Sequence, residues 1–146
     1  MKPVGKLIVA LVLIAVGSSC RSYDPEAVEA FDRLARGDVA SARTLYEAGA
    51  DVDARFQDGM TALMVMSSSA SAESVDMLLR LGADPNLHGD DGGTALMIAA
   101  KRGRVETVRL LIAAGADVHA EDDAGRTSRN HASAAGHPSV LELLED

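Results

Sequence analysis

Apolar residues recur at helical spacing in short segments of the chain, and a glycine closes each segment. Val108 and Leu111 fall on one face of a predicted helix that ends at Gly115. The preceding residues 94–102 form a shorter helical pattern that ends at Gly103. Glycine suits the position after a helix because it adopts positive φ without penalty. Helices of about ten residues are too short to be stable alone in water, so these helices must pack against neighbours.

The same landmarks recur every 33 residues along most of the chain. A threonine opens the first helix of a pair at Thr61, Thr94 and Thr127. A Gly-Ala-Asp triplet follows the second helix and begins at Gly49, Gly82 and Gly115. A glycine also stands in the turn before each first helix, at Gly59, Gly92 and Gly125. These positions indicate a repeated helix pair that buries its apolar face against the next copy.

The period and its landmarks resemble the ankyrin repeat, whose unit is a β-turn followed by two antiparallel helices. The resemblance covers residues 25–146 and implies an all-α fold, a solenoid of about four helix-turn-helix units with short β-hairpin fingers. The expected units are residues 25–57, 58–90, 91–123 and 124–146. The first unit lacks the threonine opening, so we expect it to be the N-terminal cap.

The chain departs from the family motif Thr-Pro-Leu-His-x-Ala in ways that change the expected packing. Alanine replaces the proline, and Met64 and Met97 replace the histidine, so we expect the family's Thr–His hydrogen bond to be lost and methionine packing to substitute. In the last unit Arg129 stands where the core leucine belongs. Terminal repeats need a polar outer face, so we interpret this unit as a C-terminal cap.

Two local segments affect the predicted boundaries. Asp24 followed by Pro25 predicts a helix start, because aspartate caps helices and proline is tolerated in the first turn. The serine-rich residues 67–71 are compatible with a flexible linker. Their phase places them at the end of a first helix and the following turn, so a structured turn with a less stable helix end is favoured.

Residues 1–19 differ in composition from the repeats. Lys2 and Lys6 precede the apolar residues 7–16, and small residues follow. This layout predicts a secretory signal peptide. The apolar run is shorter than the roughly 20 residues that a membrane-spanning helix needs.

The only cysteine, Cys20, stands where bacterial lipoprotein precursors carry their acylated cysteine. The resemblance is imperfect, because Gly17 occupies the usual leucine position. Ordinary signal-peptide cleavage that leaves a free thiol is the alternative. We favour lipidation, since an unpaired cysteine in an exported protein calls for an explanation. Residues 20–24 then form a lipidated N-terminus and short linker. Arg21 is not the aspartate of the inner-membrane retention signal, so we expect attachment to the outer membrane facing the periplasm, or otherwise a soluble periplasmic protein.

The formal net charge is −8, with 22 acidic against 14 basic residues and no basic stripe. This charge argues against nucleic-acid binding and favours a basic protein partner. We expect a monomer that contacts a membrane only through a lipid on Cys20.

The sequence contains no catalytic motif. The four histidines do not form a His-Glu-x-x-His pattern, and neither a nucleophile elbow nor a phosphate loop is present. We therefore expect no enzyme activity, no cofactor and no resident metal. His88 and His119 lie near acidic residues on neighbouring fingers, so a metal-binding protein is the less favoured alternative.

The resemblance implies that a partner binds at the fingertips and at the exposed positions of the first helices. By phase these residues are Arg55, Phe56, Gln57, Asp58, Met60, Ser68, Ser69, Leu81, His88, Asp90, Asp91, Lys101, Arg102, Glu121, Asp123 and Arg126. Phe56 either anchors a partner or packs onto the adjacent finger. The predicted function is a non-enzymatic protein-protein interaction module of the periplasm or cell envelope. Support of a periplasmic enzyme or of envelope assembly, and neutralisation of a toxic effector as an immunity protein, both remain open.

Overall fold

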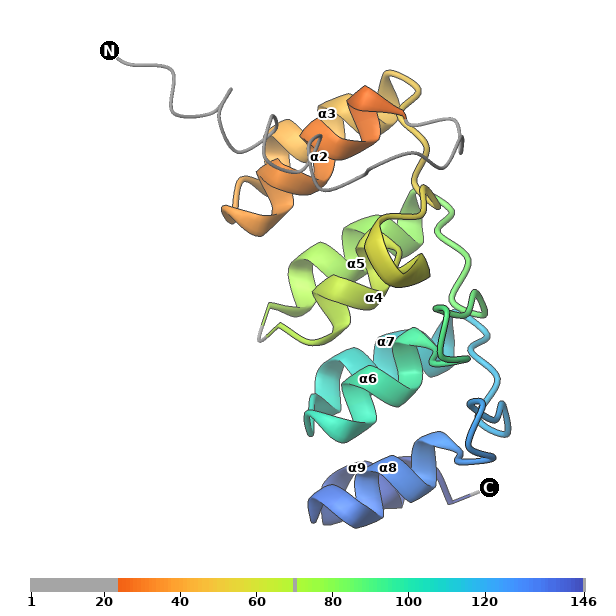
Figure 1. Ribbon diagram of the computed structural model, residues 1–146. Coiled ribbons are helices and arrows are strands. Elements are labelled where there is room, and N and C mark those ends of the chain that lie inside the picture. The colour runs from red at the N-terminus through yellow and green to blue at the C-terminus, as the bar shows by residue number, and fades with distance from the viewer. Residues whose placement is uncertain (1–23, 70, 146) are drawn as a thin grey trace. The chain divides into compact units, whose positions relative to one another are not determined.

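The computed structural model describes residues 24–69 and 71–145. This part of the chain contains eight α-helices and one 3-10 turn, and no strand is assigned in it (Figure 1). The contacts divide the chain after Asp51 into two compact units. The predicted signal peptide and Cys20 lie outside the described residues, so they stay predictions.

The first unit contains one helix pair, α2 (Pro25–Ala35) and α3 (Val39–Glu47). Asp24 caps α2, since its Oδ1 accepts a hydrogen bond from the Glu26 N–H at 2.9 Å, which confirms the predicted helix start. The other oxygen of the same carboxylate accepts from the Asp51 N–H at 2.9 Å. One side chain therefore joins the start of α2 to the segment that follows α3.

The second unit contains three stacked helix pairs (Figure 1). The pairs are α4 (Ala62–Ser67) with α5 (Ala72–Arg80), α6 (Ala95–Lys101) with α7 (Val105–Ala113), and α8 (Ser128–Ala135) with α9 (Pro138–Leu143). The first helices α4, α6 and α8 pack side by side in one layer, and α5, α7 and α9 form the second layer. This arrangement confirms the all-α fold class.

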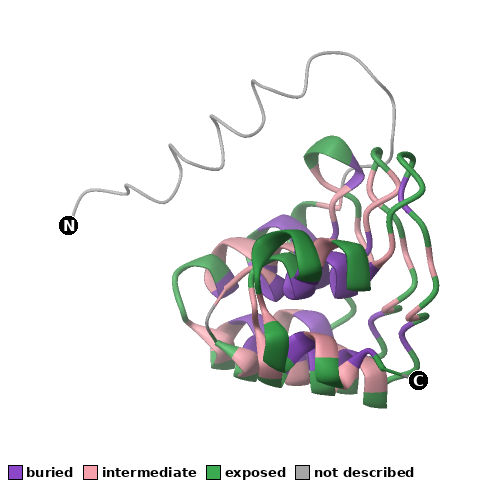
Figure 2. Ribbon diagram, turned by 90° about the horizontal axis from the view of Figure 1, so that it is seen from below, coloured by how far each residue is buried: buried purple, intermediate pink, exposed green. Residues whose placement is uncertain are grey.

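The core of the second unit lies between these helices and is built from leucine, methionine, valine and alanine. Buried and exposed residues alternate along the helices (Figure 2). Leu63 and Leu96, which follow the opening threonines, are at most 1% exposed. Met64 and Met97 are also buried, so methionine fills the space as predicted. Thr61 still caps α4, because its hydroxyl accepts from the Met64 N–H at 3.3 Å.

In the last pair the opening threonine does form a hydrogen bond with the side chain three residues later, contrary to the expectation for this family motif. Asn130 stands at the position of Met64 and Met97. Its Oδ1 accepts from the Thr127 N–H at 2.9 Å and from the Thr127 hydroxyl at 3.1 Å. The Asn130 N–H donates in return to the threonine oxygen at 3.4 Å, which completes a capping box on α8.

The serine-rich segment forms a structured turn. Ser67 ends α4, and Ser71 is the N-cap of α5. The hydroxyls of Ser68 and Ser69 donate to the carbonyls of the preceding helical turn at 2.8 and 2.7 Å. Residue 70 lies outside the described residues, but the placed serines confirm that this segment is an interhelix turn.

The fingers are tight turns with no assigned strand, so they are shorter than the expected β-hairpins. Two backbone hydrogen bonds close each finger. The outer bonds are Phe56 N–H to Met60 O (2.8 Å), Gly89 N–H to Gly93 O (2.9 Å) and Asp122 N–H to Arg126 O (3.0 Å). The inner bonds are Met60 N–H to Gln57 O (3.2 Å), Gly92 N–H to Gly89 O (3.1 Å) and Gly125 N–H to Asp122 O (2.8 Å). Neighbouring fingers are joined by the Asp90 N–H, which donates to Asp58 O at 2.9 Å, and the Asp123 N–H, which donates to Asp91 O at 3.1 Å. One backbone bond per finger pair therefore links the repeats along this edge.

A second set of hydrogen bonds links the segments that follow the second helices. The Asp84 N–H donates to Asp53 Oδ1 at 3.0 Å, and 33 residues later the Asp117 N–H donates to Asn86 Oδ1 at 2.8 Å. Asn86 also donates its amide to Gly115 O at 3.0 Å. The aspartate of the Gly-Ala-Asp triplet thus presents its backbone N–H to the preceding repeat. Its side chain closes a local turn, because Asp84 Oδ1 accepts from the Asn86 N–H at 2.8 Å and Asp117 Oδ1 accepts from the His119 N–H at 2.9 Å, which accounts for the recurrence of aspartate.

Ser128 provides a test of packing in the last pair. It is fully buried, and its hydroxyl has no hydrogen-bond partner among the described residues. The same repeat position holds Ala62 and Ala95. Removing a buried unsatisfied hydroxyl should stabilise the fold, so we expect Ser128→Ala to raise the free energy of unfolding by about 1 kcal/mol in urea denaturation.

The control is Ser133→Ala, at an exposed position of the same helix. Both substitutions improve helix propensity slightly, so only the difference between them reports on the buried hydroxyl. A lower stability for Ser128→Ala than for Ser133→Ala would show that the buried hydroxyl is satisfied in solution.

Candidate docking surface

The first helices of the second unit expose one common face. Val65, Ile98 and His131 occupy the same repeat position at mid-helix, and all three are half-buried. Residues three and four positions later lie on the same face of a helix. After Val65 these are Ser68 and Ser69, and after Ile98 they are Lys101 and Arg102. We call the surface formed by these positions of α4, α6 and α8 the inner face.

The fingers border the inner face where the first helices begin. The exposed acidic residues of this finger edge are Asp58, Asp90, Asp91, Glu121 and Asp123. Of the other predicted finger residues, Arg55, Gln57, His88 and Arg126 are exposed, whereas Phe56 and Met60 are half-buried. Within the described residues, none of the five finger-edge carboxylates forms an ion pair.

Arg55 links its own finger to the next one through hydrogen bonds. Its guanidinium donates to Gly59 O at 3.1 Å and to His88 O of the next finger at 2.6 Å. The side chain is therefore oriented by two backbone carbonyls. A charge reversal at Arg55 would disturb the finger stack as well as any bound partner, which makes it a poor probe of docking alone.

The remaining predicted residues lie at the opposite border. Ser68, Ser69, Lys101 and Arg102 stand where α4 and α6 end, so we call this border the turn edge. Helices of this length separate the two edges by roughly 10 Å at 1.5 Å per residue. Leu81 is the C-cap of α5 in the second layer, so it does not belong to the inner face, contrary to the sequence-based expectation.

The turn edge has its own contacts between repeats. Arg104 Nε donates to Ser68 O at 3.3 Å. One repeat later, His137 Nε2 lies 3.2 Å from Lys101 O. Both carbonyls belong to the last turns of first helices, where a donor satisfies an otherwise unpaired backbone group. The carbonyls of Ser68 and Lys101 are thus used in stacking, while the Lys101 side chain stays exposed.

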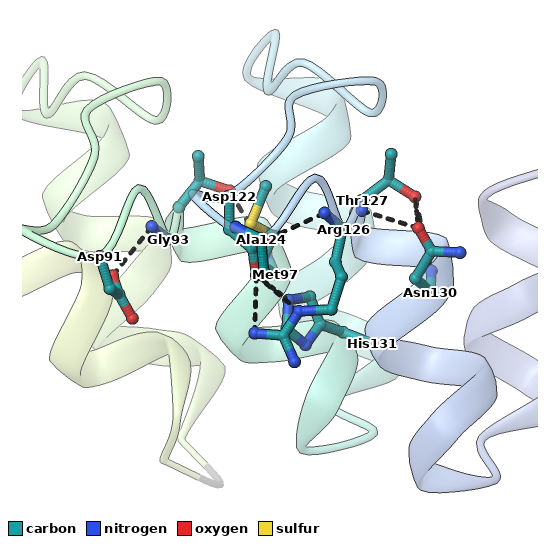
Figure 3. A network of polar contacts seen from close by, with 10 residues as sticks. Asp91, Gly93, Met97, Asp122, Ala124, Arg126, Thr127, Asn130 and His131 are labelled. Atoms are coloured by element: carbon teal, nitrogen blue, oxygen red, sulfur yellow. Dashed lines mark hydrogen bonds and ion pairs between the residues drawn. The ribbon is translucent and has the colours of Figure 1, made fainter.

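The last finger contains a polar cluster around Asp122, which is buried (Figure 3). Its Oδ1 accepts from the N–H groups of Ala124 (3.0 Å) and Arg126 (2.9 Å). Its Oδ2 accepts from Arg126 Nε at 3.1 Å and lies 2.9 Å from His131 Nε2. The backbone N–H of Arg126, followed by the side chains of His131 and Arg126, holds the pKa of the Asp122 carboxyl well below its usual range despite desolvation.

The sequence-based site did not include Val65, Ile98, Asp122 or His131. The sequence did contain an indication for Asp122 and His131. When the repeats are aligned, these two residues correspond to Phe56 in the first finger of the second unit and to Val65 in α4. A polar pair replaces an apolar pair there. The cluster joins the last finger to α8. His131 is therefore fixed in place at the repeat position that Val65 and Ile98 occupy in α4 and α6.

Asp122 predicts a specific dependence of stability on pH. Its pKa is lower in the folded than in the unfolded chain, so its contribution is complete above the unfolded value of about 4 and is lost as pH falls through the folded value. We expect the free energy of unfolding of the wild type to fall more steeply than that of Asp122→Asn between about pH 5 and pH 2. Urea denaturation at a series of pH values measures both slopes.

The control for this prediction is Asp123→Asn, which removes an exposed carboxylate of the same finger. It should retain the wild-type slope. Parallel curves for the wild type and Asp122→Asn would contradict the role assigned to the Asp122 hydrogen bonds.

The described residues form neither a metal site nor a membrane-spanning helix. Across the described part of the chain, no three or more histidine, cysteine or acidic side chains come close enough to hold a metal ion. His88 and His119 therefore do not combine with the finger carboxylates into a metal centre as the metal-binding alternative requires. None of the placed helices has the length and apolar character needed to cross a membrane.

Comparison with known proteins adds one finding. Residues 63–146 match the family model for ankyrin repeats, in three copies. No curated protein matches the chain. The matched residues include all three first helices that form the inner face except for the first residue of α4.

Proposed function

Because the chain belongs to the ankyrin-repeat family, whose repeats generally mediate protein–protein interaction and are typically non-enzymatic, we propose that it is a docking module that holds a partner protein on its inner face. The binding would be reversible and would involve no chemical step. The observation that supports this assignment is the composition of the inner face. Half-buried Val65 and Ile98 lie between an acidic finger edge and the basic residues of the turn edge.

Apolar side chains at the centre of a surface and charged side chains at its rim match the usual anatomy of protein interfaces. The central residues would supply most of the affinity by excluding water. The finger-edge carboxylates, which form no ion pair within the described residues, would mainly steer association and select a partner with basic residues.

We propose further that the module is exported and attached to the outer membrane, facing the periplasm, through a lipid on Cys20. The support is the sequence pattern of residues 1–20 alone. Inhibition of lipoprotein signal peptidase by globomycin should cause an unprocessed precursor to accumulate. The Cys20→Ala variant is the control, because its processing should be insensitive to the inhibitor. Processing of the wild type that is equally insensitive would exclude acylation of Cys20.

Site-specific photocrosslinking tests the docking function. A photoreactive amino acid at Ile98 on the inner face should capture the partner in cells. The same amino acid at Arg109, which is exposed on α7 in the second layer, should not. Capture from Arg109 alone, or from neither position, would contradict docking on the inner face.

A further inference from the structure

The spacing of the first helices restricts the shape of the segment that can bind the inner face, provided that the docking function holds. Val65 and Ile98 occupy equivalent positions on α4 and α6, which pack against each other. Packed helices lie about 8–10 Å apart, so the two apolar side chains repeat at about this distance. A complementary partner must present its own apolar side chains at a similar interval.

An α-helix meets this requirement and an extended strand does not. Residues seven apart in a helix are separated by about 10.5 Å along its axis and return to nearly the same face. Residues on one face of a strand are two or four apart, which gives about 6.7 or 13 Å. The spacing expected for packed first helices therefore favours a helix that lies along the stack.

The row of apolar positions ends at α8, in the last helix pair. His131 occupies the position of Val65 and Ile98, but its Nε2 lies 2.9 Å from Asp122 Oδ2. Only 13% of this side chain is exposed. A partner helix can therefore place two apolar residues against Val65 and Ile98. Its next residue, seven positions further along, would meet the His131 imidazole, which is hydrogen-bonded to the Asp122 carboxylate.

The two edges fix the charges that flank the partner's apolar row. One flank meets the finger edge, whose five exposed carboxylates have no ion pair within the described residues. The opposite flank meets the turn edge, where Lys101 and Arg102 are exposed at the end of α6. Opposite charges across an interface select partners and accelerate their association.

We infer that the partner of the inner face is an amphipathic α-helix of another protein. It has two apolar residues seven positions apart, a lysine- or arginine-rich flank toward the finger edge, and an acidic residue toward Lys101 and Arg102. This inference names the partner chemistry for the proposed docking function and rests on it.

Synthetic helical peptides test the inference in solution. The first carries two leucines seven residues apart, lysines along one flank and glutamates along the other. One control peptide has glutamate in place of every lysine, and another has the leucines four residues apart. Fluorescence anisotropy at low salt should show binding of the first peptide and at least roughly tenfold weaker binding of each control.

Matched variants of the protein locate the bound peptide. Asp58→Asn with Asp90→Asn removes two charges from the finger edge and should weaken binding by about threefold to tenfold. Glu73→Gln with Glu106→Gln removes two exposed charges from α5 and α7 and should leave binding unchanged. Circular dichroism checks that both variants remain folded.

Three results would overturn the inference: equal binding of either control peptide, equal effects of the two charge variants, or no binding of the first peptide. The outcome of crosslinking at Ile98 separates this inference from the docking function. If Ile98 captures a partner while the helical peptide fails to bind, docking stands and the helical partner is wrong. If Ile98 captures nothing, the docking function itself fails.

Discussion

Gly92→Ala is expected to lower the free energy of unfolding by about 3 kcal/mol, whereas Gly125→Ala should lower it by only about 1 kcal/mol. Both glycines precede a first helix and have similar positive φ values of 76° and 70°, so both substitutions pay the same backbone penalty. At Gly92 an added Cβ would lie 2.8 Å from the backbone nitrogen of Asp123 in the next finger. That finger would have to move away, and the hydrogen bond from the Asp123 N–H to Asp91 O would be lost.

Gly125 is the matched control because no backbone atom of another finger approaches it within the described residues. The nearest atom to its added Cβ would be Glu121 Oε2 at 4.0 Å. Urea denaturation of both variants therefore isolates the cost of separating two fingers from the cost of positive φ. Gly59→Ala should resemble Gly92→Ala, since the backbone nitrogen of Asp90 lies 3.0 Å from its added Cβ. Equal destabilisation at Gly92 and Gly125 would show that the fingers do not stack as closely as described.

The sequence was sufficient to predict the fold because the repeat period determines which residues are buried. Thr61 and Thr94 cap helices, and Leu63 and Leu96 are buried one repeat apart, as the aligned copies implied. Asp24 caps α2 for the same local reason. These features depend on a few neighbouring residues and on the period, and both can be identified without coordinates.

The candidate site was only partly predictable, because its organisation depends on contacts across the turns. The sequence placed fingertip and helix-end residues in one set, whereas the structure separates them into two edges with Val65 and Ile98 between them. The pairing of Asp122 with His131 requires the last finger to bring together residues nine apart. A repeat alignment identifies that two polar residues are present, but it does not specify that they meet.

Asn130 illustrates the same limit in a single residue. The methionines of the two preceding repeats implied that the threonine side-chain bond was lost, and at Met64 and Met97 packing does replace it. In the last repeat the asparagine completes a capping box with Thr127. The prediction that the threonine bond is lost was therefore correct for two copies and wrong for the last one, because the asparagine amide oxygen is a good hydrogen-bond acceptor, whereas the methionine sulfur is a weak one.

The second large effect is expected at the leucine that follows the opening threonine of the central pair. Leu96 is fully buried in α6, which packs against both α4 and α8. Truncation of a buried leucine removes its burial energy and leaves a cavity, so Leu96→Ala should lower the free energy of unfolding by about 3 kcal/mol. Urea denaturation followed by circular dichroism measures the change.

Arg129→Ala is the control, because arginine occupies the same repeat position in α8. Its side chain is 52% exposed, and its ion pair with Glu145 is long at 3.6 Å. An exposed pair of this kind contributes little, so the variant should change the free energy of unfolding by less than about 1 kcal/mol. A large loss at Arg129 would mean that the position is part of the core, and the last repeat could then no longer be regarded as a cap. A small loss at Leu96 would contradict the close packing of α6 against α4 and α8, on which the spacing of Val65 and Ile98 in the inner face depends.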